Sequence, residues 1–244
     1  MSKVTFKTVL AIAVGTVMTV SSAQAAIVHS ISGPNAGDAE AAEASFLGNL
    51  QPGYVTEGFE GFVAGTQQPE FNTSVGRFSA GTPGSGGLCT TAPYSCDGGL
   101  AVLDSVTTPF SGRFAVGGNN WLDSMDYETM TFDVSPGNNS VGFFMTDPND
   151  QGGRMDVLAT DGSEYTLDLQ NIFGGSQPNE GLFYLSFLAD ADISSLVFTA
   201  NNPNDGYGID NVTAGNVAAV PAPATLALLG MGLLGLGLSR CRKV

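Results

Sequence analysis

A series of short apolar segments separated by turn residues restricts the fold of this chain more than any other feature. The segments are rich in β-branched and aromatic residues, and in 129–134 the apolar side chains occupy every second position. This period of two places Met130, Phe132 and Val134 on one face of a strand and the polar residues on the other. Strands are therefore expected at Tyr127–Val134, Val141–Thr146, Arg154–Thr160, Glu164–Leu169, Leu182–Leu188, Ile193–Ala200 and Tyr207–Val212.

The connections between these strands have the composition of tight turns. Asp161-Gly162 joins two alternating runs, which is a strong hairpin signal. The other connections combine Pro or Gly with Asn and Asp at residues 135–138, 147–150 and 202–206. Short strands joined in this way predict an all-β domain, a jelly-roll-like antiparallel β-sandwich over residues 54–215.

The residues before this domain, 26–53, have a helical pattern instead. Asn35 or Asp38 is placed to cap a helix that runs through Ala39 and Phe46 and ends near Gly48. We therefore expect a short helix ahead of the sandwich.

The first 25 residues have the pattern of a secretory signal peptide. Lys3 and Lys7 precede the apolar stretch Val9–Val20, and Ala23-Gln24-Ala25 has the small residues of a cleavage site. We expect an exported protein whose mature chain begins at Ala26.

Residues 216–244 contain a second apolar segment. Ala224–Leu238 is shorter than the roughly 20 apolar residues that usually span a bilayer. Pro221 and Pro223 disfavour helix before them, so a single short transmembrane helix is expected to start near Ala224. The basic residues that follow would hold its end in the cytoplasm by the positive-inside rule, and they are Arg240, Arg242 and Lys243.

The order of short motif, apolar segment and basic stop resembles the carboxy-terminal signal of the PEP-CTERM proteins, with Val220, Pro221, Ala222 and Pro223 as the sorting motif. The resemblance implies that an exosortase-type membrane enzyme cuts the tail after transient anchoring in the inner membrane. It also implies a mature protein at the cell surface or in the extracellular matrix of a Gram-negative bacterium that is rich in exopolysaccharide. Ala222 departs from the Glu that the family usually has between the prolines. An ordinary single-pass anchor is the alternative.

Removing both terminal signals makes the remaining chain strongly acidic. The sequence has 8 basic and 23 acidic residues, and five of the basic ones belong to the two signals. Only Arg77, Arg113 and Arg154 then stand against 23 acids, a balance of −20. Such a charge repels nucleic acid, so we expect no nucleic-acid partner. The negative charge also suits the capture of divalent cations. The alternative is that the charge only keeps the protein soluble.

A second resemblance concerns the domain itself. The motifs at 59–62, 142–153 and 205–212 resemble, in this order, the jelly-roll domains of PEP-CTERM proteins, which are distantly similar to carbohydrate-binding and MAM-type sandwiches. This likeness implies that Glu60 on an early strand and Asp210 on the last strand share a calcium ion.

Loop composition adds further candidate calcium ligands. Calcium prefers six to eight hard oxygens, and loops dense in Asp and Asn supply them. Asp147, Asp150 and Asp205 are therefore candidates beside the pair named above, with calcium in a structural role. The alternative is that these residues only cap turns.

Cysteine and histidine content limits the chemistry. Cys89 and Cys96 lie in a loop rich in Gly, Ser and Thr, and we expect them to form a disulfide in an oxidising periplasm. The single histidine, His29, leaves neither a zinc site nor a Ser-His-Asp or Cys-His arrangement. No pair of carboxylates stands out for glycoside hydrolysis. We therefore expect a protein that is not an enzyme.

The leading hypothesis is a non-catalytic exported surface or matrix protein that is associated with exopolysaccharide. Trp121, Tyr127 and Tyr207 are the candidates for stacking on sugar rings, with core packing as the alternative for each. The other hypotheses are a calcium-stabilised adhesion or structural module without sugar affinity, and a polysaccharide-active hydrolase.

Overall fold

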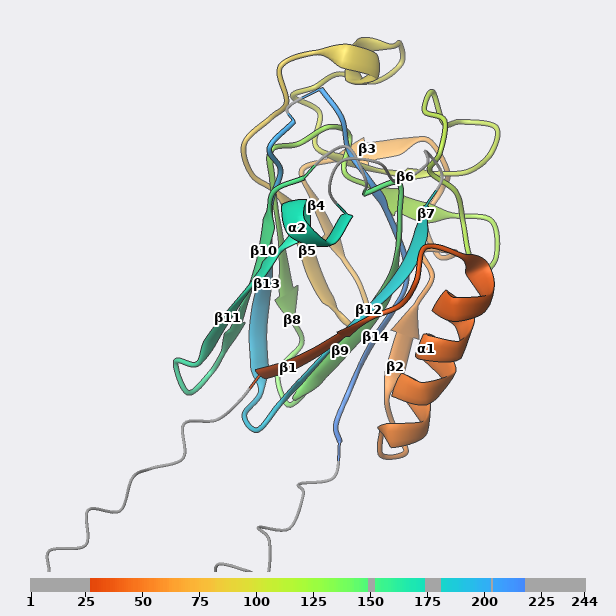
Figure 1. The fold of residues 1–244 in the computed structure, drawn as a ribbon. Helices are drawn as coiled ribbons and strands as arrows, with labels where there is room; N and C mark the ends of the chain where they lie inside the picture. Colours follow the sequence, from red (N-terminus) through yellow and green to blue (C-terminus); the bar gives the residue numbers. More distant parts are fainter. Residues whose placement is uncertain (1–26, 149–151, 174–180, 203, 218–244) are drawn as a thin grey trace, which may run out of the picture.

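The chain folds into two antiparallel β-sheets that pack face to face (Figure 1). The computed structural model describes residues 27–148, 152–173, 181–202 and 204–217. The larger sheet has eight strands, in the order β1 (Ile27–Ile31), β12 (Leu182–Ala189), β9 (Ser140–Thr146), β14 (Gly208–Gly215), β7 (Trp121–Asp123), β6 (Leu100–Leu103) and β3 (Thr66–Gln68), with β2 (Val55–Glu57) also paired to β14. The smaller sheet has six, in the order β11 (Glu164–Asp168), β10 (Arg154–Ala159), β13 (Ile193–Thr199), β8 (Thr129–Val134), β5 (Gly76–Ala80) and β4 (Glu70–Asn72).

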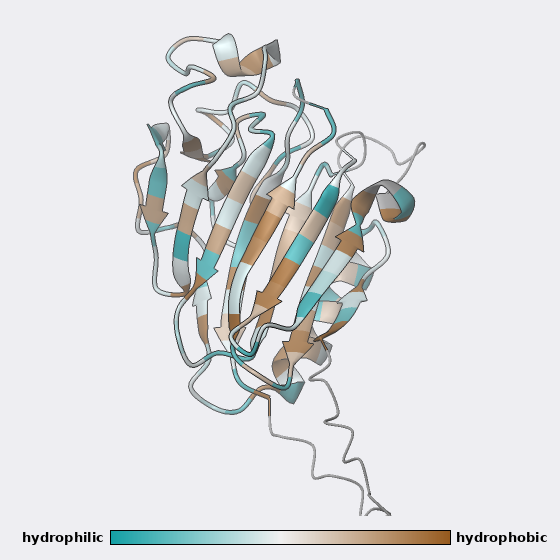
Figure 2. Cartoon of the chain, turned by 90° about the vertical axis from the view of Figure 1, so that its left-hand side faces the viewer, coloured by the Kyte–Doolittle hydropathy of each residue, from teal (hydrophilic) through white to brown (hydrophobic). Residues whose placement is uncertain are grey.

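The space between the sheets is filled by one large apolar core. Strand β8 alternates between half-buried polar and buried apolar residues, so Met130, Phe132 and Val134 point inward as their spacing predicts. The ring of Phe132 stacks on that of Phe78 of β5, with ring centroids 4.2 Å apart. Hydropathy mapped on the ribbon shows hydrophobic and hydrophilic bands that follow one another along the strands (Figure 2).

The central strands of the larger sheet are covered on both faces. All seven residues of β9 are buried, and its five central residues, 141–145, form a continuous non-polar run rather than an alternating one. Its outer face packs against helix α1 (Ala36–Asn49), where Phe46 contacts Tyr184 with ring centroids 5.9 Å apart. Gly142 is required at this contact, because a Cβ there would overlap the Tyr184 hydroxyl and come 2.8 Å from Phe46. Asn35 caps the helix by accepting a hydrogen bond from the backbone of Asp38.

The predicted sandwich and the first helix agree with the structure, and each of the seven predicted strands overlaps an observed strand, but two differences remain. Residues 27–31 form strand β1, which pairs along its whole length with β12, so the sandwich begins at Ile27 rather than at residue 54. Three of the five β1 residues are exposed, as befits an edge strand. That short, mostly exposed strand has no alternating or long apolar pattern of its own, and its place in the sheet comes from pairing with β12. A short helix, α2 (Leu169–Phe173), was also not expected.

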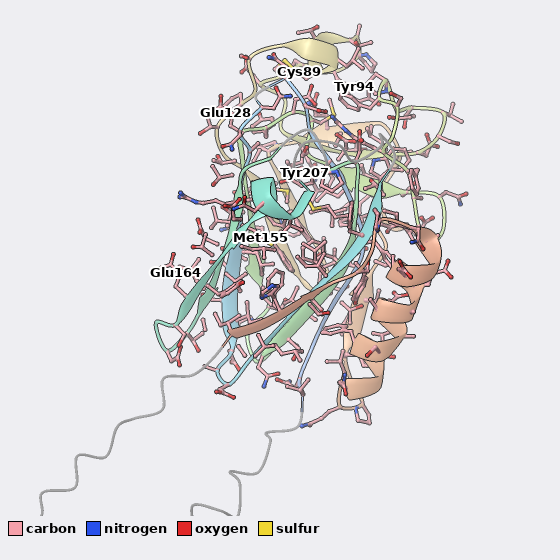
Figure 3. The ribbon with its side chains drawn as sticks, in the orientation of Figure 1. Cys89, Tyr94, Glu128, Met155, Glu164 and Tyr207 are labelled. Atoms are coloured by element: carbon pink, nitrogen blue, oxygen red, sulfur yellow. A yellow bond between two sulfur atoms is a disulfide. The ribbon has the colours of Figure 1, made fainter. Side chains whose placement is uncertain are left out.

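A second apolar cluster lies at one end of the sandwich, beneath the loop that contains the 3₁₀ turn η1 (Gly87–Thr90). Cys89 and Cys96 are joined by the predicted disulfide. Cys89 is fully buried and packs in the same cluster as Trp121 and Tyr127. The loop is therefore closed over apolar side chains, and Figure 3 shows Cys89 and Tyr94 at this end of the molecule, which we call the loop end.

Both predicted terminal signals lie outside the described residues. The predicted signal peptide occupies residues 1–25, and the sorting motif, apolar segment and basic stop occupy residues 220–243. Among the helices formed by residues 27–217, none combines the length and the apolar character needed to span a membrane.

Candidate functional site

Arg113 lies at the loop end, surrounded by four carboxylates from three separate parts of the chain. It belongs to the long connection between β6 and β7, and it is 5 % exposed. Asp123 and Asp126 come from the end of β7 and the turn after it, Asp147 directly follows β9, and Asp205 precedes β14. The sandwich topology brings these strand ends together, since β7, β9 and β14 are neighbours in one sheet.

The guanidinium of Arg113 binds three of these carboxylates directly. Nη1 donates to Oδ1 of Asp123 at 3.0 Å, and Nη2 donates to Oδ1 of Asp126 at 3.0 Å and of Asp205 at 2.9 Å. Oδ2 of Asp147 lies 4.0 Å from Nε. Among these groups Asp123 is the best satisfied, because it also accepts hydrogen bonds from the indole of Trp121 and the backbone of Met125. We call Arg113 and these four aspartates the Arg113 cluster.

Burial and neighbouring charges shift the pKa values of the Arg113 cluster in opposite directions. Loss of hydration raises the pKa of Asp123 and of Asp126, and the positive charge of Arg113 counteracts this. Burial acts to lower the pKa of Arg113, but the surrounding carboxylates outweigh it and the pKa is raised above its usual range. One guanidinium serves four carboxylates, so negative charge is in excess here.

A small pocket opens beside the Arg113 cluster, with a volume of about 100 Å³. Its lining combines the apolar side chains of Leu88 and Phe110 with the carboxylates of Asp126, Asp147 and Asp205. Oδ2 of Asp126 is fully buried and has no hydrogen-bond partner among the described residues. Because this oxygen has almost no accessible surface, a molecule in the pocket does not contact it, and Arg113 is the basic side chain of the lining.

A second polar arrangement holds Glu60 and Asp210 against the loop 116–120. Oε1 of Glu60 accepts hydrogen bonds from the backbone amides of Asn119 and Asn120, both at 2.7 Å. Oδ2 of Asp210 accepts from the amides of Val116 at 2.7 Å and Gly117 at 3.0 Å. We call this arrangement the Glu60–Asp210 clamp, because two carboxylates fix one loop. Asp210 lies on β14, as predicted, whereas Glu60 lies in the turn after β2 and not on a strand, because β2 ends at Glu57.

The two carboxylates of the clamp differ in their surroundings. Asp210 is 1 % exposed, whereas Glu60 is exposed. Desolvation raises the pKa of Asp210 to about 7, with a smaller contribution from the charge of Glu60 and with three backbone hydrogen bonds acting against the shift. The clamp therefore places a carboxyl group that titrates near neutral pH at the centre of a loop junction.

Backbone conformations with positive φ gather at these two arrangements. Non-glycine residues rarely adopt them, yet Asp126 and Asp147 of the Arg113 cluster have φ of 62° and 57°. Phe59 and Asn211, which adjoin the clamp carboxylates in sequence, have φ of 59° and 47°. Such outliers persist only where the surroundings fix them, and they mark both places as candidate sites.

The structure separates the five predicted calcium ligands. Glu60 and Asp210 meet at the clamp, whereas Asp147 and Asp205 belong to the Arg113 cluster, and Asp150 lies outside the described residues. Glu60 and Asp210, the pair expected to share an ion, therefore lie together, and Asp147 and Asp205 lie apart from them. In the part of the chain that the structure describes, no group of three or more His, Cys, Asp or Glu side chains is arranged to hold a metal ion.

The predicted sugar-stacking role of three aromatic residues is wrong, because all three are core residues. Trp121, Tyr127 and Tyr207 are 1 %, 4 % and 2 % exposed. Their polar groups or rings are engaged inside the protein: the indole of Trp121 donates to Asp123, and the hydroxyl of Tyr127 accepts from the amide of Gly99. Tyr207 stacks on Phe198 in the main core, as its position in Figure 3 shows. Rings in these positions offer no face to a sugar.

Sequence reasoning did not find the Arg113 cluster. Asp123 and Asp126 follow a strand of only three residues, which has too few positions to show a pattern. One signal was present: Arg113 is one of three basic residues in a segment with 23 acids, and it falls in a loop without an adjacent acid in sequence. An isolated basic residue in so acidic a chain indicates that folding places an acidic residue from elsewhere in the sequence beside it.

Replacing Arg113 by Met is expected to lower the free energy of unfolding by about 3–5 kcal/mol, because it leaves buried carboxylates without their counter-charge. The deficit should shrink at about pH 4, where the carboxylates accept protons. Urea unfolding of the variant and the parent at pH 7 and pH 4 measures both effects. Arg77→Met is the matched control, because Arg77 forms an exposed ion pair with Asp133. Equal losses in the two variants would show that burial of the Arg113 cluster has no special role.

Asp210 should make stability depend on pH. Its pKa is about 7 in the folded chain and near 3.8 in the unfolded chain, so the folded state binds the proton more tightly. Its contribution is fully present below the unfolded pKa and is lost as the pH rises through about 7. In buffers with a chelator, the free energy of unfolding should therefore fall more steeply between pH 4 and 7 in the parent than in Asp210→Asn. Parallel pH profiles for the two proteins would contradict this.

Comparison with known proteins gives information mainly on the carboxy-terminal end. The model of the PEP-CTERM protein-sorting motif matches residues 219–243. Among solved structures, the K2 cleaved adhesin domain of Lys-gingipain is similar, with a TM-score of 0.40 and 14 % identity over 66 % of this chain and 98 % of that domain. The curated proteins contain no match. The chain therefore carries a PEP-CTERM protein-sorting motif at its carboxy-terminal end, joined to an antiparallel β-sandwich.

Proposed function

We propose that this protein is a non-catalytic, exported surface protein that an exosortase-type enzyme sorts through its carboxy-terminal tail. The observation that supports this is the match of the PEP-CTERM protein-sorting motif to residues 219–243. In this proposal Val220–Pro223 is the recognition motif, and the apolar segment after it holds the tail in the inner membrane until cleavage. The mature protein is the β-sandwich, at the cell surface or in the extracellular matrix.

Association with exopolysaccharide is the role that we propose for the sandwich. With the aromatic residues buried, the support comes from polar groups at the loop end, where the pocket beside the Arg113 cluster combines carboxylates with two apolar side chains. Sugar rings have polar edges and apolar faces, so such a mixed lining suits them. The acidic balance of the chain disfavours anionic polymers as partners.

A second candidate is a calcium-stabilised module, and the Glu60–Asp210 clamp favours it. Two carboxylates that are distant in sequence converge on one loop, and burial raises the pKa of Asp210. A cation beside them would stabilise both carboxylates in their charged form. Backbone carbonyls and the side chain of Asn211 would have to complete the oxygen ligands that calcium needs.

The sorting proposal predicts a processing defect. Replacing Pro221 and Pro223 by Ala together should leave an uncut form that retains Val244 in the membrane fraction, because the recognition motif is lost. The measurement is the intact mass of the protein from its own host, compared between the envelope and the culture medium. Pro52→Ala, a change far from the tail, is the control and should be processed normally. Identical mature masses for the double variant and the parent would overturn the proposal.

The calcium candidate predicts a ligand-dependent melting temperature. If calcium binds the clamp, a hundredfold excess over Kd adds about 2.7 kcal/mol of stability, which raises the midpoint of thermal unfolding. The Glu60→Gln variant should not show this calcium-dependent increase. Glu164→Gln removes the same charge at an exposed position of β11, and this variant should still show the increase. Calcium should also keep Asp210 ionised and so reduce the pH dependence. A midpoint that is the same in calcium and in a chelator would reject this candidate.

A further inference from the structure

Three Asn-x-Ser/Thr tripeptides occur in the sequence, and each has the pattern of an acceptor for N-linked glycosylation. Their first residues are Asn72, Asn138 and Asn211. In such a tripeptide the amide of the asparagine is the group that reacts, and the hydroxyl of the third residue is part of what the transferase recognises. A folded chain is therefore an acceptor only where both side chains are accessible.

The fold makes two of the tripeptides inaccessible. Ser140, the third residue of the Asn138 tripeptide, is fully buried in β9, and the side-chain amide of Asn138 donates to a backbone carbonyl at 2.8 Å. Thr213, the third residue of the Asn211 tripeptide, is fully buried in β14, and its hydroxyl lies 2.7 Å from that of Thr56. An enzyme would have to open the larger sheet to reach either hydroxyl.

The tripeptide Asn72-Thr73-Ser74 is exposed instead. Asn72 is the last residue of β4, Ser74 lies in the tight turn that leads to β5, and both are exposed. The turn is held by Thr73, whose backbone amide and hydroxyl donate to the carbonyl of Gly76 at 2.8 and 2.7 Å. The hydroxyl of Ser74 makes an exposed contact of 3.2 Å with Glu57, which water or an enzyme can replace. The turn therefore presents both recognition groups at the surface.

An acidic neighbour also distinguishes this tripeptide from the other two. Glu70 is exposed and lies two residues before Asn72, whereas Pro136 and Ile209 occupy the same position before the other two tripeptides. The carboxylate of Glu70 lies 3.6 Å from Arg77 in an exposed pair, which solvent screens. A transferase that selects its acceptor partly by charge would find an acid at this position only beside Asn72.

The turn lies at the end of the sandwich from which the carboxy-terminal segment leaves. The carbonyl of Val75, directly after the tripeptide, accepts from the backbone of Ser135 at 2.9 Å. In the same β8–β9 connection, the carbonyl of Gly137 accepts from the side chain of Asn216 at 2.7 Å. Asn216 stands three positions before residue 219, where the match to the sorting motif begins. In the sorting proposal the tail holds this end near the inner membrane, where lipid-linked glycosyl donors reside.

We propose that Asn72 is the acceptor for an N-linked oligosaccharide, transferred to the folded, exported chain by a membrane-bound oligosaccharyltransferase. The amide nitrogen of Asn72 forms a bond to the anomeric carbon of an oligosaccharide that is linked to a lipid diphosphate. The bond from that carbon to the diphosphate oxygen breaks, and the lipid diphosphate leaves with the electron pair. The amide gives up one proton to a base of the transferase. The inference rests on the proposed export of the chain, and it is independent of the proposed association with exopolysaccharide.

A glycan at Asn72 would cover an open edge of the smaller sheet. In the part of the chain that the structure describes, β4 pairs with β5 alone and is the last strand of its sheet. Open edge strands can pair with other chains and cause aggregation. A bulky hydrophilic group at the end of β4 disfavours such pairing.

The test is the intact mass of the mature protein from its own host, with peptide fragmentation to locate any added mass. The parent should exceed the mass of its sequence by whole sugar residues attached to Asn72. Asn72→Gln should lose all of this added mass. Ser74→Ala should also lose it, whereas Ser74→Thr keeps the hydroxyl and should retain it. Both positions are exposed, so the midpoint of thermal unfolding of each variant, measured on unglycosylated protein, should match that of the parent.

Asn138→Gln is the control, because it removes a tripeptide that the fold makes inaccessible, and the added mass should be unchanged. Sugar found on Asn138 or Asn211 would overturn the proposal, because selection by the folded structure would have failed. The same added mass in Asn72→Gln as in the parent would overturn it too. Equal modification of the two Ser74 variants would show that the tripeptide is not what the transferase recognises, and would have the same consequence.

The same spectra separate this proposal from the sorting proposal. A mature chain that ends within Val220–Pro223 and carries no sugar on Asn72 would leave the sorting proposal standing and reject the acceptor site. A chain that carries the sugar and retains Val244 would do the reverse. A chain that retains Met1 and carries no sugar would reject both.

Discussion

Burial of the apolar face shared by the two sheets is the constraint on which the rest of this structure depends. Phe78 and Phe132 of the smaller sheet stack within it, and Phe143 and Phe198 bring the two sheets into contact with ring centroids 5.9 Å apart. Removing such side chains from water is the main favourable term in folding. Because this core fixes how the strands lie, it also fixes where the strands end, and the loops at those ends form both candidate sites.

The loop end contains a buried arginine surrounded by carboxylates. The segment 26–219 has three basic residues and buries one of them, Arg113, among four aspartates. A buried ion pair gives little net stability by itself, because desolvation offsets most of the attraction. Its effect here is to join four loops at one point. The arrangement leaves one buried carboxylate oxygen, Oδ2 of Asp126, without a donor among the described residues.

The Glu60–Asp210 clamp joins loops by a different means. Its donors are backbone amides, so the loop 116–120 is held by carboxylates without any basic side chain. This solution suits an acidic chain in which cations are scarce. The two sites also differ in their hydrogen bonding. In the clamp, backbone amides donate to the carboxylates, whereas in the Arg113 cluster one carboxylate oxygen has no donor among the described residues.

The sequence by itself determined the two-sheet class through a period of two, and the first helix through the cap at Asn35. It also determined the disulfide through two nearby cysteines, and the sorting motif through a short motif before an apolar run. Each of these features depends on local spacing. Tertiary structure alone decided which polar residues meet. Asp147 and Asp205 looked like partners of Glu60 and Asp210, but the order of β7, β9 and β14 places them around Arg113. The burial of Trp121 was likewise set by packing against the disulfide loop, which no local pattern encodes.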